Sequence, residues 1–380
     1  MEIGGDGKMN ERERFLAVME YQPKDKVPNH ELGIWPQTIA RWDAEGAPQE
    51  GGRFDWWQGP GPFNLDKREF IPVNFDMIPF YEPQLLERTE RYETIVDERG
   101  RTRLGLIEGS IGGGRMCMDT YLDFPVKNLA DFRKMQKRFE AHLDARYPQD
   151  WKANVPRWKN REHVLILARN CNAAGFYWRA REWVGTENLS YMWYDDPLLC
   201  HEMMEFYADF TIEVARPILA ETDIDYFNLN EDFAGKGTPL IGPGTFKEFI
   251  SKPLMRLVEF LKSHGVRYVC LDSDGTTDAL IPSMMDAGID VHWPLERASG
   301  MDPIRVRKEY GRDLRLWGGV DKRELARGPA AIDAHLRELL PLIEEGGYIP
   351  TVDHTVPPDI SWDNFCYYMD AKKRLLEGTL

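Results

Sequence analysis

The second half of the chain alternates short apolar segments with longer amphipathic ones, and this alternation constrains the fold more than any other feature. The apolar segments predict strands at residues 225–230, 267–272, 290–293, 315–320 and 348–352. The segments between them predict helices at residues 244–263, 276–287, 303–310 and 329–345. Strands too apolar to face water, each followed by a helix, are typical of a parallel sheet that helices cover on the outside.

The first half of the chain shows the same two periods less regularly. A helix is predicted at Glu11–Met19, followed by a strand at Val27–Leu32, and another core strand is predicted at Val164–Ala168. Between these strands, residues 92–109 have the pattern of a β-hairpin.

The length of the chain fits one large barrel with additions. About 250 residues are enough for a plain (β/α)₈ TIM barrel, and the chain has 380. We therefore expect an α/β fold in which residues 27–380 form a single (β/α)₈ barrel domain, with an N-terminal insertion at about 50–160 that covers the barrel mouth. Residues 1–26 are expected to be a leader and a helix.

The composition excludes several classes of partner. The chain carries 48 basic and 63 acidic residues, a formal net charge of −15, which disfavours binding to nucleic acid or to an anionic membrane surface. Its five cysteines include no CxxC pair, which indicates reduced thiols and not a disulfide framework. The first ten residues lack an apolar signal core, and no segment has the length and apolarity of a membrane span. A cytoplasmic protein is the expectation.

One short segment places two acids on a predicted core strand. In CLDSDG, Cys270 to Gly275, side chains two residues apart point to the same face, so Asp272 and Asp274 share the face of Cys270. They also stand at the carboxyl end of the strand, where barrel enzymes build their active sites. Two neighbouring carboxylates that lose hydration need a cation, a shared proton or hydrogen-bond donors.

Two interpretations of these acids remain open from the residues alone. A divalent metal would neutralise both carboxylates, provided that a third ligand comes from another strand. Alternatively, Asp274 caps the following helix near Thr277, and Asp272 pairs with an arginine.

Other predicted strands also end in polar or ionisable side chains, which predicts a convergent polar mouth. These residues are His30, Glu31, Asn230, Glu231, Asp232, His292 and His354. Aromatic side chains follow the same strands or the predicted insertions, and those expected to wall an apolar pocket are Trp35, Trp183 and Trp293.

Seven segments in order along nearly the whole chain resemble the uroporphyrinogen decarboxylase (URO-D) superfamily. They include ERERFLAVMEYQPKDKVP near the start, GTENLSYMWYDDPLLCHEMM in the middle, and then GPGTFKEFISKP, HGVRYVCLDSDG, AGIDVHWPLERASGMDP, LRLWGGVDKRELARGP and EEGGYIPTVDHTVPPDISWDNFCYY. The resemblance implies a (β/α)₈ barrel and one of two chemistries, decarboxylation or corrinoid-dependent methyl transfer.

The resemblance is closer to the methyltransferase branch. True uroporphyrinogen decarboxylases carry an arginine-rich loop after the first strand that grips the carboxylates of the substrate. Here that stretch reads HELGIWPQTIARW, and its nearest arginine, Arg41, lies within the following helix. In the alternative, a decarboxylase acting on a carboxylated substrate, Asp76 would stabilise a protonated intermediate.

In the methyltransferase branch, the coenzyme M members hold zinc with a His-x-Cys pair at one strand end and a cysteine near the end of the last strand. By resemblance, Asp272, Asp274 and His354 take these positions. Two aspartates and one histidine are harder ligands than thiolates, which suits Zn²⁺ with an oxygen substrate, or Mn²⁺ or Fe²⁺.

The resemblance thus implies a metal-dependent substrate:corrinoid methyltransferase that demethylates a small methoxy or other methylated compound. Glu231 and Asp232 would be a fourth ligand or the general acid. The substrate-binding residues would be His30, Glu31, Trp35, Arg179, Arg181, Trp183, Asn230, His292 and Trp293.

The partners implied are a small-molecule methyl donor and a corrinoid carrier protein. The sequence has no DxHxxG motif, so the cobalamin is expected from that carrier protein. A homodimer is one state open to the chain, and a non-catalytic ligand-binding role is the remaining alternative.

Overall fold

A curled, parallel seven-stranded sheet forms the centre of the protein in a computed structural model, which describes residues 8–48, 62–111, 114–115, 118–168 and 175–380. The strand order is β1-β8-β9-β10-β11-β12-β13. The strands are β1 (Arg68–Ile71), β8 (Val164–Leu167), β9 (Tyr226–Asn230), β10 (Tyr268–Asp272), β11 (Val291–Trp293), β12 (Arg315–Trp317) and β13 (Tyr348–Ile349). Six of the seven lie within segments predicted as strands, and β1 was not predicted.

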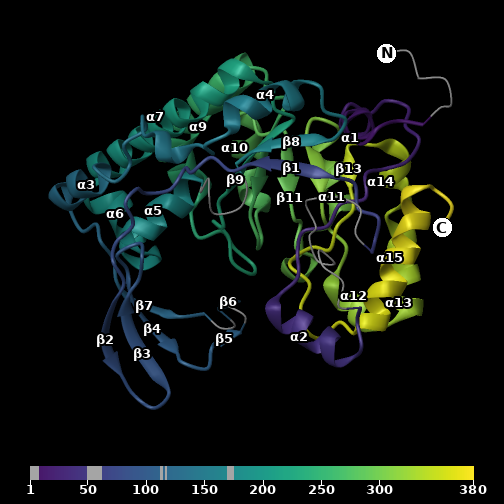
Figure 1. Cartoon of the computed structure of the whole chain (residues 1–380), viewed down its shortest axis with the longest axis horizontal. Helices are drawn as coiled ribbons and strands as arrows, with labels where there is room; N and C mark the ends of the chain where they lie inside the picture. The colour runs from purple at the N-terminus through teal and green to yellow at the C-terminus, as the bar shows by residue number, and fades with distance from the viewer. Residues whose placement is uncertain (1–7, 49–61, 112–113, 116–117, 169–174) are drawn as a thin grey trace.

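Helices cover the outside of this sheet (Figure 1), as the alternation predicted. They are α1 (Glu11–Met19), α2 (Pro36–Ala44), α3 (Leu129–Gln136), α4 (Trp151–Lys159), α5 (Phe176–Val184), α6 (Thr186–Asp195), α7 (Pro197–Glu221), α8 (Pro243–Thr245), α9 (Ser251–Ser263), α10 (Ile281–Asp286), α11 (Pro303–Tyr310), α12 (Lys322–Ala326), α13 (Pro329–Glu338), α14 (Leu340–Glu345) and α15 (Trp362–Leu376). A π-helical turn, Phe246–Ile250, joins α8 to α9. The α/β, TIM-barrel-like fold is therefore confirmed.

The segment predicted as the first strand runs between the two ends of the sheet without forming a regular strand. On one side, Asp66 donates its backbone N–H to the carbonyl of Asn29. On the other, Ile34 forms an isolated parallel bridge to Val356, and the carboxylate of Glu31 accepts from the backbone of Val352. Side-chain bonds thus replace part of the backbone ladder that an eighth barrel strand would make.

The pairing of the central strands confirms which face of β10 looks inward. Asp272 lies beside Asn230 of β9 and Trp293 of β11, and Cys270 lies beside Asn228. The indole of Trp293 donates to Asn228 Oδ1 over 2.8 Å across the interior. Cys270 and Asp272 therefore share the inner face of the sheet, as their two-residue spacing predicted.

Helix α1 closes the floor of the barrel. Phe15, on this helix, is fully buried. Its ring lies about 6 Å from the rings of Tyr226, Tyr268 and Trp317, the last residue of β12. The amino-terminal ends of the strands are in this way sealed by apolar packing, which leaves the carboxyl ends as the open side.

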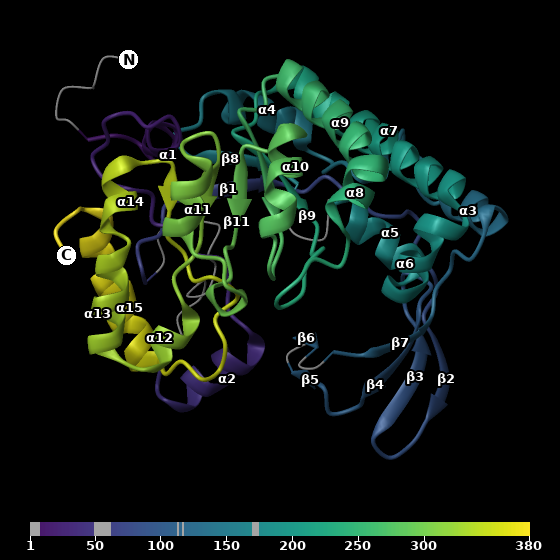
Figure 2. The same cartoon turned by 180° about the vertical axis from the view of Figure 1, so that it is seen from behind.

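An antiparallel four-stranded sheet occupies much of the predicted insertion. It has the order β2-β3-β4-β7. Its strands are β2 (Gln84–Arg88), β3 (Tyr92–Val96), β4 (Thr102–Leu106) and β7 (Thr120–Asp123), and a small hairpin, β5 (Ser110–Ile111) and β6 (Gly114–Arg115), follows β4. Figures 1 and 2 show it projecting as an arm next to α5 and α6, across from α2 and α12 at the same end of the barrel, so it flanks the mouth. The range 50–160 also contains β1, which belongs to the barrel itself.

Among the helices that the structure describes, none has both the length and the apolarity to cross a lipid bilayer.

Candidate functional site

The carboxyl ends of β9 and β10 bring three aspartates together. Asp272 is the last residue of β10, and Asp274 lies two residues further along the chain. Asp232 follows β9 with a backbone φ of 41°, in the left-handed region that Asp tolerates better than most residues. This turn directs the carboxylate of Asp232 to the backbone N–H of Asp274, with which it forms a hydrogen bond.

His354 completes this group from the segment after β13. Its Nε2 lies 3.1 Å from Asp274 Oδ2, and both side chains are partly open to solvent, at 25% and 35%. The indole of Trp35, which is 37% exposed, stacks on the imidazole with ring centroids 6.1 Å apart. The mouth therefore combines an acid–imidazole pair with an accessible aromatic face.

The charges in the mouth are poorly compensated. Burial and the neighbouring charges of Asp274 and Asp232 raise the pKa of Asp272 well above its ordinary value. Burial, with the charge of Asp274, also raises the pKa of Asp232 to about 6. Arg181 of α5 is a cation near Asp232, and its Nη2 lies 4.0 Å from the Asp232 carboxylate. The mouth is thus suited to a cation or a proton.

Burial lowers the pKa of His354, but the hydrogen bond and the charge of Asp274 outweigh it, so that the pKa lies above its ordinary value. The neighbouring carboxylate therefore favours the charged form of the imidazole.

The predicted metal ligands fit a metal only in part. Around a tetrahedral Zn²⁺ with bonds of about 2.0–2.2 Å, two ligand atoms lie roughly 3.4 Å apart, close to the spacing of Asp274 Oδ2 and His354 Nε2. In the described part of the chain, however, no group of three or more His, Cys, Asp or Glu side chains is placed to hold a metal ion. Asp272 would have to turn toward the other two before the set is complete.

Two further residues of the mouth were missed from the sequence. Lys322 Nζ pairs with Glu296 Oε1 at 2.9 Å, and both charges act on His354. Asp353 is buried and accepts from the backbone N–H of Lys322 and of Arg297, which holds the loops together below His354. The sequence contains a pattern that could have identified these residues. Two predicted strands each end in Val, which Asp and then a basic residue follow, in GGVDK at 318–322 and in PTVDH at 350–354.

Asn230 and Trp293 lie beside the acids, as their register with Asp272 requires. Both are nearly buried, so they form the base of the mouth. His30 and Glu31 lie deeper. His30 stacks on Trp317 with centroids 5.3 Å apart, and burial lowers its pKa well below its ordinary value.

Glu31 is committed to a buried network and not to substrate. Its Oε1 lies 2.6 Å from both Lys372 Nζ and the hydroxyl of Tyr368, and both partners are buried. The carboxylate thus links α15 to the segment that closes the barrel.

Glu231 has a structural position in place of the predicted catalytic one. Its buried carboxylate accepts from the backbone N–H groups of Phe176, Tyr177 and Trp178, at the start of α5. Burial raises its pKa to about 7, although these three bonds lower it. A Cβ on Gly175 would lie 2.0 Å from the Glu231 Cδ, so only glycine fits there. The prediction of Glu231 as ligand or acid therefore needs correction.

Arg179 and Trp183, predicted to bind substrate, lie in the core behind α5. Arg179 is fully buried and pairs with Asp76 at 2.9 Å and Glu182 at 2.7 Å. Trp183 packs against Phe132, Phe139 and Tyr207. A helix turns by about 100° per residue, so Arg179 and Arg181 point to nearly opposite sides, and only Arg181 reaches the mouth.

His292 faces the outer helices and not the interior. Its Nε2 lies 2.7 Å from Thr277 Oγ1, and its Nδ1 lies 3.3 Å from the carbonyl of Leu271. Burial lowers its pKa to about 4. The neighbouring Trp293 faces inward, so the alternation along β11 excludes His292 from the mouth.

Comparison with known proteins identifies the family. Residues 180–375, more than half of the chain, match the sequence profile of the family described as Uroporphyrinogen decarboxylase (URO-D). A curated uroporphyrinogen decarboxylase from Nocardia farcinica is 27% identical over 179 residues, which are 46% of this chain and 48% of that protein. The match thus spans about half the length of that relative.

A solved structure shares the fold over nearly the whole length. A methyltransferase from Methanosarcina mazei aligns with a TM-score of 0.60 over 97% of this chain and 99% of its own, at 15% sequence identity. At this identity the similarity shows the common fold alone.

Proposed function

The chain belongs to the uroporphyrinogen decarboxylase family, and within it we propose that the protein is a substrate:corrinoid methyltransferase that demethylates a small methoxy or similarly methylated compound. The observation that carries this proposal is the convergence of Asp232, Asp272, Asp274 and His354 at the carboxyl ends of the barrel strands. Three carboxylates, one imidazole and an aromatic wall suit a small, weakly charged substrate better than a polyanion.

Each residue of the mouth would have a separate role in demethylation. Asp272, Asp274 and His354 would hold a divalent metal, most suitably zinc, which when bound supplies a Lewis acid for the oxygen of the C–O bond. Asp232 lies beside this set and would give a proton to the oxygen that departs with the electron pair of that bond. Trp35 and Trp293 would hold the substrate, and Arg181 would orient Asp232 or a substrate carboxylate.

Cobalamin would be supplied by a separate carrier protein as the methyl acceptor, as the resemblance of the sequence implies. Such a carrier must reach the mouth. The open side of the barrel allows it to approach from the carboxyl ends of the strands, beside the arm (Figure 2).

The alternative function is decarboxylation, which the similarity to the Nocardia enzyme favours. Two observations weigh against it. Asp76, the residue assigned to it, is paired with Arg179 and with Arg99 at 2.6 Å. Arg41 lies on α2 with Nε 2.7 Å from Glu45 Oε1, so it is not free to grip a carboxylated porphyrinogen.

A direct test measures methyl transfer from a panel of methoxybenzoates to cob(I)alamin, followed by the absorbance of methylcobalamin. We expect activity in the wild type and a loss of about 100-fold or more in Asp274→Asn. Asp286→Asn, which changes an exposed carboxylate away from the mouth, should leave the rate unchanged. Release of CO₂ from a carboxylated substrate without methyl transfer would establish the alternative.

Metal content is measured separately on protein purified without chelators. We expect about one divalent metal per chain in the wild type and in Asp286→Ala, and its loss in Asp272→Ala and His354→Ala. Metal that survives both substitutions would place the site elsewhere, and a wild type without metal would refute the ligand assignment.

A further inference from the structure

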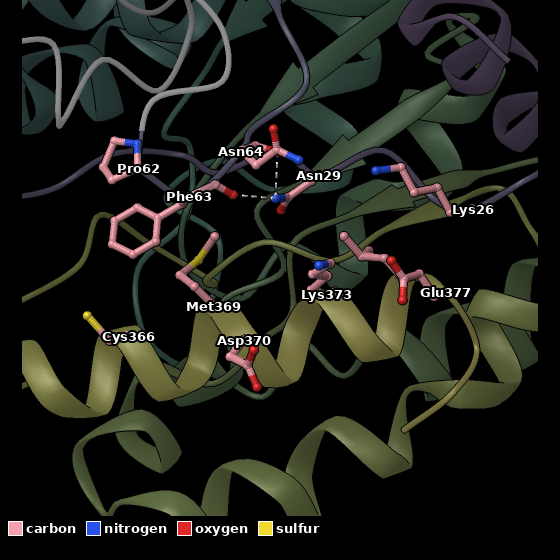
Figure 3. Close-up of a pocket in the computed structure, with 11 residues that line it drawn as sticks. Lys26, Asn29, Pro62, Phe63, Asn64, Cys366, Met369, Asp370, Lys373 and Glu377 are labelled. Carbon is pink, nitrogen blue, oxygen red and sulfur yellow. Dashed lines mark hydrogen bonds between the residues drawn. The ribbon is translucent and has the colours of Figure 1, made fainter. Parts of the chain in front are cut away.

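Two features of the surface are separate from the mouth, a hollow beside α15 and the outer edge of the arm. The hollow lies between α15 and the segments 26–29 and 62–64, and its volume is about 320 Å³ (Figure 3). The charged side chains at its rim, among them Asp370 and Lys373, are exposed and of both signs, so they select no class of ligand. The edge of the arm, in contrast, has the composition of a contact surface.

Strand β2 forms this outer edge. In the described part of the chain, the order β2-β3-β4-β7 gives β2 one hydrogen-bonded neighbour, β3, and leaves its other side open. All five of its residues are exposed, with Leu85 at 58% and Leu86 at 55%. Figures 1 and 2 show β2 as the strand of the arm farthest from α2 and α12, so it faces away from the mouth. An edge strand with two exposed leucines is a template on which a further strand can pair.

The charges at the two ends of β2 have no partner in their own chain. Among the residues that the structure describes, neither Glu82, just before β2, nor Arg88, its last residue, forms an ion pair. The opposite edge of the arm differs, because Asp123 of β7 pairs with Lys127 at 2.8 Å. The β2 edge therefore keeps one acid and one base for a partner molecule.

A second copy of the chain supplies the complementary strand. When two β2 strands pair antiparallel with Leu85 on a two-fold axis, the leucines meet at the centre, and Arg88 of each copy lies opposite Glu82 of the other. A parallel pairing would instead place Arg88 against the same residue of the other copy. An antiparallel pairing centred on Leu86 would place Glu82 against Glu90. The register centred on Leu85 thus matches both the leucines and the charges.

We propose that the protein forms a symmetric homodimer through the β2 edges of its arms, which joins the two four-stranded sheets into one continuous sheet. A two-fold contact uses the same edge of both copies and is therefore closed, so it does not extend into a filament. Because β2 faces away from the mouth, the pairing leaves both mouths open.

The contact is short, and this sets its strength. Pro83 has no N–H to donate at the start of the strand, and the register of β2 against β3 shifts between Leu85 and Glu87. A single pair of short edges is smaller than the interface of a permanent dimer. The dissociation constant is therefore expected in the micromolar range.

Sedimentation velocity of the full chain over a range of concentrations tests the proposal. The wild type should change from one chain to two as its concentration rises from nanomolar to submillimolar. Leu85→Asp should remain a single chain throughout, because it places two carboxylates together on the axis. Met255→Asp, which changes another exposed apolar side chain, on α9, is the matched control and should dimerise as the wild type does. Circular dichroism checks that both variants are folded.

Reversal of the end charges tests the register. Glu82→Arg and Arg88→Glu should each weaken the dimer about tenfold, because two pairs of unlike charges become two pairs of like charges. An equal mixture of these two variants should restore the dimer, because every contact between the two different chains is again one of unlike charges. The double variant Glu82→Arg/Arg88→Glu should dimerise as the wild type does.

Hydrogen–deuterium exchange locates the contact. Backbone N–H groups within β2 should exchange more slowly in the dimer than in the monomer, and those of β7 should not change. The proposal is overturned if the wild type is a single chain at every concentration, if its mass exceeds two chains, or if Leu85→Asp dimerises as the wild type does. It is also overturned if the mixture of the two charge variants does not restore the dimer, or if the protection appears at β7 and not at β2.

Discussion

Two aspartates at opposite ends of neighbouring strands have opposite surroundings. Asp225, immediately before β9, is fully buried at the floor of the barrel and lies 2.8 Å from Arg12 Nε and 3.0 Å from Arg161 Nη2. It also accepts from the backbone N–H of Leu165. Asp272, at the mouth end of β10, has Asp232 and Asp274 as its charged neighbours. At the floor, arginines neutralise the carboxylate of Asp225, whereas at the mouth three carboxylates of like charge lie close together.

The same contrast appears in the pKa values of two other acids. Burial alone would raise the pKa of Glu69, on β1, but hydrogen bonds from His163, Arg157 and Trp158 outweigh it and hold the pKa far below its ordinary value. At the mouth, burial and Asp274 raise the pKa of Asp232 to about 6. Carboxylates at the floor contribute to stability, and those at the mouth hold a charge imbalance that a ligand can relieve.

The largest expected effect is on stability, and it follows from substitution of Asp225 at the floor. Asp225→Asn should lower the free energy of unfolding by about 3–5 kcal/mol, because it leaves the buried guanidinium of Arg161 with only the half-exposed carboxylate of Asp223, 3.5 Å away. In metal-free protein, Asp272→Asn removes a repelled carboxylate and should leave stability within about 1 kcal/mol of the wild type, or raise it. Urea unfolding measures both variants. An equal loss in the two would mean that the acids at the mouth are compensated after all.

A second pair of substitutions separates the two faces of α5. Arg179→Met should destabilise the protein by about 3 kcal/mol, because Asp76 and Glu182 lose a buried partner, while the folded fraction keeps its rate of methyl transfer. Arg181→Met should change stability by less than about 1 kcal/mol and lower the rate roughly tenfold. Arg216→Met, on the exposed face of α7, serves as the control for both. A reversed pattern would place Arg179 at the substrate.

The smallest expected effect concerns pH. Since the pKa of Glu69 is lower in the folded than in the unfolded chain, its contribution to stability is present above about pH 4.3 and is lost as the pH falls below that value. Glu69→Gln should therefore be less stable than the wild type by about 1–2 kcal/mol at pH 7, and the difference should shrink toward pH 3. Unfolding curves at several pH values measure it. A difference that grows on acidification would contradict the assignment.

The sequence predicted those features that depend on local periodicity. The two-residue period of β10 placed Cys270 and Asp272 on the inner face, and α1 and α11 begin and end where the pattern predicted. It missed β1, because Arg68–Ile71 is short and carries two charged residues, of which Arg68 is buried against the carbonyl of Glu31.

The candidate site was predicted only in part for a related reason. Asp274 and His354 meet as the resemblance implied, but sequence does not show which side of an element a polar residue faces. Glu231 differs from Asp232 by a single position, yet the left-handed turn at Asp232 sends one carboxylate to the mouth and leaves the other under α5. Such a division depends on tertiary contacts that have no local pattern.

The floor formed by Phe15 has a consequence for the order of folding. Its ring partners on β9, β10 and β12 follow it by more than 200 residues, so during synthesis α1 leaves the ribosome long before any of them exists. Contacts of such long sequence separation close slowly, because their chain entropy is lost before their packing is gained. Helix α1 is thus made early and docks late, and its apolar face is a surface to which a chaperone has a long opportunity to bind.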